Sequence, residues 1–145
     1  MTFTYPVLVR WSDIDSYDHV NNVRYFDYLQ EARIAFLTQL MAATGDYFEQ
    51  YPCVLVSQTV DYLRPILLRH PPYDVDVWIA AVGTSSYTLG SRIVDRSGES
   101  EDVYAKAESV IVAVDGTTHA KRPLGVAEKA ALLKHVVTLE RLDPR

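Results

Sequence analysis

The sequence contains a single cysteine, Cys53, among its 145 residues. One cysteine excludes an internal disulfide and a zinc site built from several cysteines, and it is typical of a reducing compartment. No apolar run approaches the roughly 20 residues that a membrane-spanning helix needs. The first residues also lack the basic start, the apolar core and the cleavage site of a secretory signal. We therefore expect a cytoplasmic protein that does not bind a membrane.

Internal repeats, low-complexity stretches and linkers rich in Pro, Ser or Gly are also absent. A length of 145 residues is typical of one ordinary domain, so the sequence predicts a single domain over residues 1–145. The 19 acidic residues outnumber the 14 basic residues and leave a net charge of -5. This acidic balance argues against binding to nucleic acid.

The hydrophobic pattern changes early in the chain. Alternation from Phe3 to Trp11 predicts a half-buried strand, and Pro6 is typical of an edge strand or a bulge. Apolar residues then recur every three or four positions, at Tyr25, Leu29, Ala32, Phe36 and Leu40. This spacing predicts an amphipathic helix of about four turns, with Asn21 or Asn22 as its N-cap.

The remainder of the chain is mostly strand-like. Four more strands are predicted, at Cys53–Leu63, Tyr73–Val82, Tyr87–Val94 and Val103–Val114. A short helix is expected at Ala127–His135, with Pro123 in its first turn. One long helix beside a successive antiparallel meander indicates an α+β fold in which the sheet wraps around the helix.

The segment Asp13–Asn22 holds three carboxylates, one histidine and two carboxamides. A calcium-binding EF-hand loop does not fit, because Tyr17, Asp18 and Arg24 break its ligand pattern. A transition-metal site at Asp13, Asp15 and His19 lacks a second histidine nearby, so we expect no metal. Two interpretations stay open: the side chains cap the helix and satisfy the turn, or one carboxylate works beside the unpaired N–H groups of the helix start.

Several of these residues resemble a known signature. Arg10–Asp15 and His19–Asn22, followed by Tyr25, Tyr28, Glu31, Ala32 and Arg33, resemble the hotdog-fold acyl-CoA thioesterases, most of all the 4-hydroxybenzoyl-CoA thioesterase branch. The resemblance continues through Asp61–Pro65 and Ser85–Tyr87. It implies a hotdog fold, hydrolysis of an acyl-CoA thioester, no cofactor besides the coenzyme A of the substrate, and a homodimer or homotetramer with its sites at the shared interface.

The resemblance also assigns roles within the loop. Asp15 matches the catalytic carboxylate, which either attacks the thioester or activates a water molecule. The backbone N–H that polarises the carbonyl matches Asn22 or an immediate neighbour, while Asp13 is expected to order the loop. The chain departs from the family pattern at Asp18, where relatives commonly have glycine, and at Pro71–Asp74, where they commonly have a Gly-Asp pair.

Three other residues have two interpretations each. His19 is a catalytic base or a structural hydrogen-bonding residue, and Tyr25 lines an acyl pocket or packs in the core. Ser86 contacts the pantetheine arm or is only a turn residue.

Coenzyme A is anionic, so a net-negative chain needs local cations to bind it. The candidates are Arg64, Arg69, Arg92, Arg96, Lys121 and Arg122.

Two other functions remain as alternatives. The first is a non-catalytic hotdog protein that binds acyl-CoA or an acyl carrier. The second is a hotdog enoyl-CoA hydratase, which is disfavoured because Asp15 and His19 are four positions apart and lack the Gly-Asp-x-Asn-Pro context of that chemistry.

Overall fold

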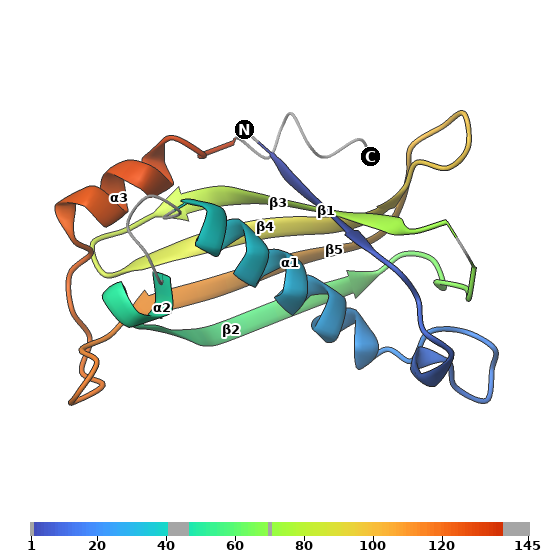
Figure 1. Ribbon diagram of the computed structural model, residues 1–145, viewed down its shortest axis with the longest axis horizontal. Coiled ribbons are helices and arrows are strands. Elements are labelled where there is room, and N and C mark those ends of the chain that lie inside the picture. The colour runs from blue at the N-terminus through green and yellow to red at the C-terminus, as the bar shows by residue number, and fades with distance from the viewer. Residues whose placement is uncertain (1, 41–46, 70, 138–145) are drawn as a thin grey trace.

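A long helix lies against one face of an antiparallel sheet in the computed structural model, which describes residues 2–40, 47–69 and 71–137 (Figure 1). The elements in chain order are β1 (Phe3–Val7), η1 (Trp11–Asp13), α1 (Arg24–Leu40), α2 (Tyr47–Gln50), β2 (Cys53–Tyr62), β3 (Tyr73–Val82), β4 (Ser86–Asp95), β5 (Asp102–Ala113) and α3 (Val126–Leu133). The five strands form one sheet in the order β1-β3-β4-β5-β2. The α+β class and the arrangement of the sheet around one long helix are confirmed.

The apolar stripe of α1 forms the centre of the core. Tyr25, Leu29, Ala32 and Phe36 are all buried, as their spacing predicts, and they contact the core side of the sheet. On β3 this side carries Val75, Val77 and Ile79, which alternate with Asp76 and Trp78 on the opposite face. Burial of this shared apolar surface is the main force that holds the helix on the sheet.

The first strand is shorter than its sequence pattern predicts. It ends at Val7, and Trp11 begins the 3-10 helix η1 with 81% of its surface exposed. Pro6 lies on an edge strand as expected, because β3 is the one neighbour of β1 in the described sheet. The prediction that Trp11 belongs to this strand is therefore wrong, because the chain turns away from the sheet before reaching it.

The predicted order of the strands is also wrong in one respect. Strands β3, β4 and β5 form the expected meander, but β2 pairs with β5 at the far edge and not with β3. The described residues between Tyr62 and Tyr73, 63–69 and 71–72, lie outside the strands, and Ile66 among them is fully buried. A connection of this length removes the constraint that adjacent strands in the sequence must be neighbours in the sheet.

The C-terminal helix begins close to its expected start and ends earlier than expected. Gly125 is the N-cap of α3, and Glu128 accepts a hydrogen bond from the Gly125 N–H at 3.0 Å. Pro123 therefore precedes the helix instead of occupying its first turn, and His135 follows it. No helix in the described part of the chain is long and apolar enough to cross a bilayer.

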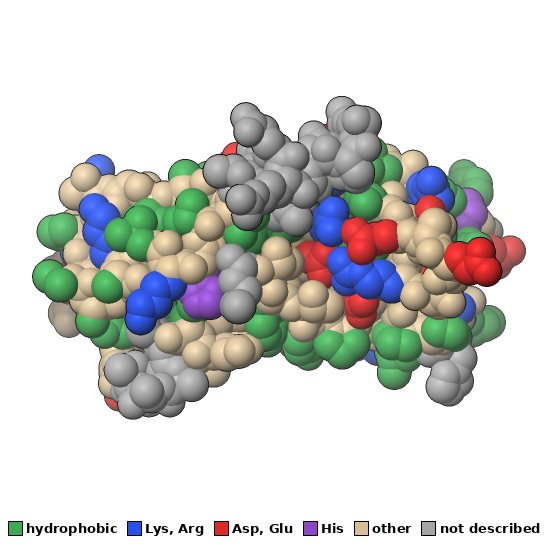
Figure 2. Space-filling view, turned by 90° about the horizontal axis from the view of Figure 1, so that it is seen from above, with side chains coloured by type: hydrophobic (Ala, Val, Ile, Leu, Met, Phe, Trp, Pro, Cys, Tyr) green, Lys and Arg blue, Asp and Glu red, His purple; other side chains and the backbone are tan. Residues whose placement is uncertain are grey.

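The sheet face opposite α1 carries a network of paired charges. The buried carboxylate of Asp76 accepts hydrogen bonds from Arg92 at 3.0 Å and from Arg96 at 2.6 Å, and both arginines also bind Glu101. In the view of Figure 2, basic and acidic side chains touch in one group right of the centre, whereas the basic side chains at the left of the view lie apart from acidic ones. These arginines are therefore neutralised within the protein.

Candidate active site

Asp15 lies at the base of a short loop between η1 and α1. Ile14 and Val20 pair as an isolated antiparallel bridge, and the Asp15 N–H donates a hydrogen bond to the His19 carbonyl at 3.0 Å. The Tyr17 N–H donates to Asp15 Oδ1 at 2.9 Å. No hydrogen bond reaches Asp15 Oδ2 from the described residues. One carboxylate oxygen is therefore held while the other is open to a ligand.

The loop turns at Asp18, where the sequence departs from the family pattern. The φ angle of Asp18 is 62°, in the left-handed region that glycine favours. Aspartate enters this region more readily than most side chains do. Asp18 therefore gives the loop the tight turn that a glycine would give. The hydrogen bond between the Asp15 N–H and the His19 carbonyl at the base of the loop is kept.

Asp13 lies beneath this loop and is only 1% exposed. Its carboxylate accepts a 2.6 Å hydrogen bond from the Tyr28 hydroxyl and three hydrogen bonds from Arg10, from the backbone N–H at 3.0 Å, from Nη2 at 3.1 Å and from Nε at 3.4 Å. Burial by itself raises the pKa of Asp13, but the hydrogen bonds from Tyr28 and Arg10 outweigh it and hold the pKa below its ordinary value. Asp13 thus orders the loop, as expected.

The start of α1 is capped by Asn21, the first of the two candidate residues. Asn21 Oδ1 accepts the Val23 N–H at 2.9 Å, and the Asn21 carbonyl accepts the Arg24 N–H at 2.8 Å. The N–H of Asn22 donates no hydrogen bond to any described residue. Because N–H groups at a helix start carry the positive end of the helix dipole, this free donor can bind a partly negative oxygen.

Two tyrosines join the end of β2 to the start of α1. The Tyr62 hydroxyl donates to the Asn22 carbonyl at 2.9 Å, and its ring packs edge-on against Tyr25 with the centroids 4.8 Å apart. The buried Tyr25 hydroxyl donates to the Arg64 carbonyl at 3.2 Å and accepts the Ile66 N–H at 3.2 Å. Burial raises the pKa of Tyr25, so this hydroxyl stays neutral.

A pocket of about 360 Å³ opens at this place, where the loop, α1 and the end of β2 meet. It brings together five residues that the sequence singled out: Asp15, His19, Asn22, Tyr25 and Arg64. Its other walls are Tyr17, Val20, Tyr62, Leu63 and Pro65. Sequence reasoning assigned no role to Tyr62, although the segment Asp61–Pro65 that resembles the family signature pointed to its position.

His19 contributes a pocket wall and a backbone group. Its imidazole makes no hydrogen bond with the described residues, and its carbonyl accepts the Asp15 N–H. Of the two interpretations of His19, the structural hydrogen bond is made by its backbone, while its side chain forms part of the pocket wall. Within the described ranges, no group of three His, Cys, Asp or Glu side chains lies close enough to hold a metal ion.

Ser86 lies at the other end of the sheet. It pairs with Val112 of β5, whereas Tyr62 of the pocket lies opposite Ala105 of the same strand. Seven positions along a strand correspond to about 23 Å. Within one chain, the structure does not bring Ser86 to Asp15.

Most of the candidate cations are already paired. Carboxylates bind Arg69, Arg92, Arg96 and Arg122 at 2.6 to 3.0 Å. Arg64 is different because it lines the pocket, is 54% exposed, and approaches Asp102 only to 3.5 Å. Among these five arginines, Arg64 is the one that is free to meet an anionic ligand.

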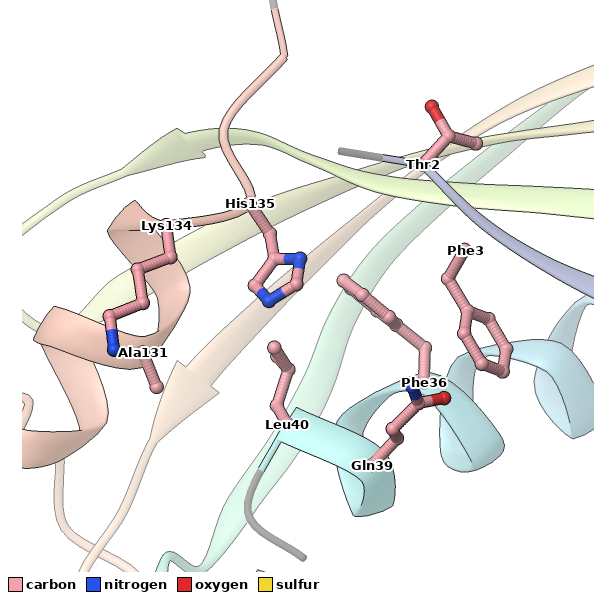
Figure 3. A pocket seen from close by; sticks show the side chains of 8 residues that line it. All are labelled: Thr2, Phe3, Phe36, Gln39, Leu40, Ala131, Lys134 and His135. Atoms are coloured by element: carbon pink, nitrogen blue, oxygen red, sulfur yellow. The ribbon is translucent and has the colours of Figure 1, made fainter.

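A second pocket of about 280 Å³ lies at the opposite end of α1 (Figure 3). Phe3, Phe36 and Leu40 form its apolar wall, and Lys134 and His135 approach it from the end of α3. Its described lining contains no carboxylate and no helix N-terminus. This lining therefore lacks the two groups that attack and polarise a carbonyl.

The chain is similar to known thioesterases in sequence and in structure. The family model of the thioesterase-like superfamily matches residues 9–137. The uncharacterized protein YsmA of Bacillus subtilis (strain 168) is 37% identical over 91 residues, which are 61% of this chain and 58% of that protein. This match thus spans less than two thirds of the relative.

Two solved structures are similar over nearly the whole chain. A thioesterase from Thermus thermophilus, complexed with coenzyme A and Zn, is 29% identical, covers 90% of this chain and 92% of its own, and has a TM-score of 0.76. The PA2801 protein of Pseudomonas aeruginosa is 32% identical, covers 90% of this chain and 95% of its own, and has a TM-score of 0.70. The expected hotdog fold is thereby confirmed.

Proposed function

The chain belongs to the thioesterase-like superfamily, and from this premise we propose that it hydrolyses an acyl-CoA thioester to a free acid and coenzyme A. The observation that carries the proposal is the meeting of two complementary groups in one pocket. Asp15 presents an open carboxylate oxygen, and Asn22 presents an unpaired N–H at the start of α1. A nucleophile or base beside a preorganised N–H is what acyl transfer requires.

In the proposed reaction, the thioester carbonyl oxygen accepts a hydrogen bond from the Asn22 N–H. Negative charge grows on this oxygen as the carbonyl carbon is attacked, and the N–H and the helix dipole stabilise it. In one route Asp15 attacks the carbon, which gives a mixed anhydride and coenzyme A thiolate, and water then hydrolyses the anhydride. In the other route Asp15 takes a proton from the water molecule that attacks the carbonyl carbon. Both routes consume one water and release one acid and one thiol.

Two other pocket residues fit an acyl-CoA substrate. The guanidinium of Arg64 is half exposed and only loosely bound to Asp102, so it is available to a phosphate of coenzyme A. Tyr25 lines the pocket, and its two hydroxyl hydrogen bonds hold its ring in place. We assign Tyr25 to the wall that the acyl group contacts and Arg64 to the rim where coenzyme A enters.

We also propose that the active form is a homodimer or a homotetramer of dimers built on β2. This edge strand exposes Val54, Leu55 and Val56 by 43%, 42% and 55%, and an uncovered apolar edge strand favours pairing with another strand. Buried nitrogens of Arg33 on α1 and Gln58 on β2 also have no partner among the described residues. A second copy that covers this side would bury the edge and offer acceptors to both nitrogens.

Such a dimer also explains the distant position of Ser86. Antiparallel pairing of two β2 strands about a two-fold axis places the Cys53 end of one strand beside the Tyr62 end of the other. Ser86 lies at the Cys53 end, since Val112 of β5 pairs with both Ser86 and Val54. In the proposed dimer, Ser86 of the partner subunit approaches the pantetheine arm at the pocket of Asp15.

The test of the reaction measures thiol release from aromatic, short-chain and long-chain acyl-CoAs. We expect Asp15→Asn to lower kcat by a factor on the order of one hundred or more, the scale of a positioned acid, base or nucleophile. Asp18→Asn is the matched control, because it makes the same chemical change in the same loop and should keep wild-type turnover. Comparable rates for wild type and Asp15→Asn would exclude the mechanism, and no hydrolysis of any thioester would favour an acyl-CoA-binding protein.

The test of the dimer measures mass in solution by light scattering. We expect the wild type to have at least twice the mass of one chain and Val56→Lys to shift it toward the monomer. Leu133→Lys is the matched control, since Leu133 is 53% exposed but lies on α3, away from β2. A monomeric wild type, or a control that dissociates as readily, would refute the proposed interface.

A further inference from the structure

The carbonyl of Asn22 is not used by the helix that follows it. In a regular α-helix this oxygen would accept the N–H of Phe26, four residues later. Here the Phe26 N–H donates instead to the Val23 carbonyl, at 3.1 Å, which tightens the first turn. The Asn22 carbonyl is therefore left outside the helical hydrogen bonds. The donor that satisfies it is the hydroxyl of Tyr62, at 2.9 Å.

Tyr62 is thus the only described residue outside the loop and α1 whose side chain makes a hydrogen bond with the backbone of residues 21–23. The adjacent groups are fixed locally: Asn21 Oδ1 binds the Val23 N–H, and the Asn21 carbonyl binds the Arg24 N–H. Tyr62 comes from the last position of β2, at the end of the molecule where α1 begins (Figure 1). Its ring is seated by the edge-on contact with Tyr25.

We infer that Tyr62 is a positioning residue for the proposed thioesterase reaction, holding the Asn22 carbonyl away from the substrate so that the Asn22 N–H points at the thioester oxygen. The inference rests on the proposed function.

Two physical effects support this role. The hydrogen bond fixes the peptide plane next to the Asn22 N–H, which preorganises the donor before the substrate arrives. It also occupies a carbonyl lone pair that would otherwise repel the negative charge growing on the thioester oxygen. Both effects are larger in the transition state than in the ground state, so they act on kcat more than on KM.

The experiment compares Tyr62→Phe with Tyr5→Phe. Both variants lose one phenolic hydroxyl, but Tyr5 lies on β1, outside the pocket of Asp15, and its hydroxyl makes no hydrogen bond with the described residues. We expect Tyr62→Phe to lower kcat about tenfold with little change in KM, less than the loss of an entire oxyanion donor. Tyr5→Phe should retain the wild-type kcat.

A second readout follows the carbonyl itself. An acyl-CoA labelled with carbon-13 at its carbonyl is bound to the Asp15→Asn variant, and the infrared carbonyl stretch reports how strongly the bound carbonyl is polarised. Adding Tyr62→Phe to this variant should shift the carbonyl stretching frequency back toward its value in water. If the role of Tyr62 is purely structural, the substitution will leave this frequency unchanged and lower the free energy of unfolding.

The outcomes separate the two hypotheses. If the wild type hydrolyses no thioester, the proposed function fails. If the wild type hydrolyses thioesters but Tyr62→Phe keeps the wild-type kcat, or loses kcat with an unshifted carbonyl stretch, the role of Tyr62 is refuted and the function stands.

Discussion

Asp13 and Asp15 are two positions apart in the sequence, yet their surroundings are opposite. Asp13 is buried, and both of its carboxylate oxygens accept hydrogen bonds from Arg10 or Tyr28. Asp15 lines a pocket with one oxygen held by a backbone N–H and the other open to a ligand, as far as the described residues extend. A carboxylate whose hydrogen bonds are all made within the protein stabilises the fold, whereas one with an open oxygen can act on a ligand.

The largest expected effect on stability comes from Asp13→Asn. Removing the charge weakens the hydrogen bonds from Tyr28 and Arg10 together, and we expect the free energy of unfolding to fall by about 3 kcal/mol. The measurement is urea denaturation at neutral pH. Asp15→Asn is the control and should change stability by less than about 0.5 kcal/mol. Equal losses in the two variants would contradict the division between a structural and a functional aspartate.

A smaller loss is expected for Tyr28→Phe. This variant keeps the buried ring but removes the 2.6 Å hydrogen bond to Asp13, and a hydrogen bond to a charged group contributes about 1.5 kcal/mol or more. Burial and the hydrogen bond to Asp13 both raise the pKa of Tyr28, so its hydroxyl remains the donor throughout the neutral range. Thermal unfolding of Tyr28→Phe and of Tyr28→Phe with Asp13→Asn should show that the two losses are not additive.

The pH dependence of stability should separate the two aspartates. The folded-state pKa of Asp13 is lowered, so its contribution is fully present above the unfolded pKa of about 3.9 and is lost as pH falls through the folded value. The stability gap between wild type and Asp13→Asn should therefore close as pH falls below about 4. Urea denaturation in a series of acidic buffers measures this gap, and a gap that is constant with pH would be inconsistent with an ionised Asp13.

The smallest effect concerns the turn at Asp18. Because its φ angle is 62°, we expect Asp18→Gly to raise stability by about 0.5 kcal/mol and Asp18→Val to lower it by about 1 kcal/mol or more. Chemical denaturation compares the two variants. Thiol release by Asp18→Gly should equal that of the wild type, and a large loss of activity would mean that the Asp18 side chain itself takes part in the reaction.

Much of the fold could be predicted from local patterns. The three-to-four spacing from Tyr25 to Leu40 identified α1, and alternation between turn residues identified β3, β4 and β5 closely. The pairing of β2 could not be predicted, because strand neighbours are set by the path of the connection after Tyr62 and not by the composition of the strand. The same limit applies to Trp11, whose apolar side chain continues a strand pattern that the backbone abandons after Val7.

The pocket was partly predictable for a similar reason. Asp15, His19 and Asn22 are close in the sequence, so any tight loop before a helix brings them together. Tyr62 and Arg64 come much later in the chain and reach the same place only because β2 ends beside the start of α1. Their contacts with distant parts of the chain leave no periodic signal in the sequence.

The sequence by itself determined the α+β class, the long amphipathic helix, the family resemblance and the segment that we propose as the reactive one, because these features depend on residues that are near one another along the chain. Only the tertiary structure decided which aspartate is satisfied and which is open, because Tyr28 and Arg10 enclose Asp13 while the loop turn leaves Asp15 at the pocket. It also decided that the Asn22 N–H stays free of the described residues while Tyr62 takes the Asn22 carbonyl. Hydrogen bonds form between groups that lie close together in space, and residues far apart in the sequence come close only when the chain folds.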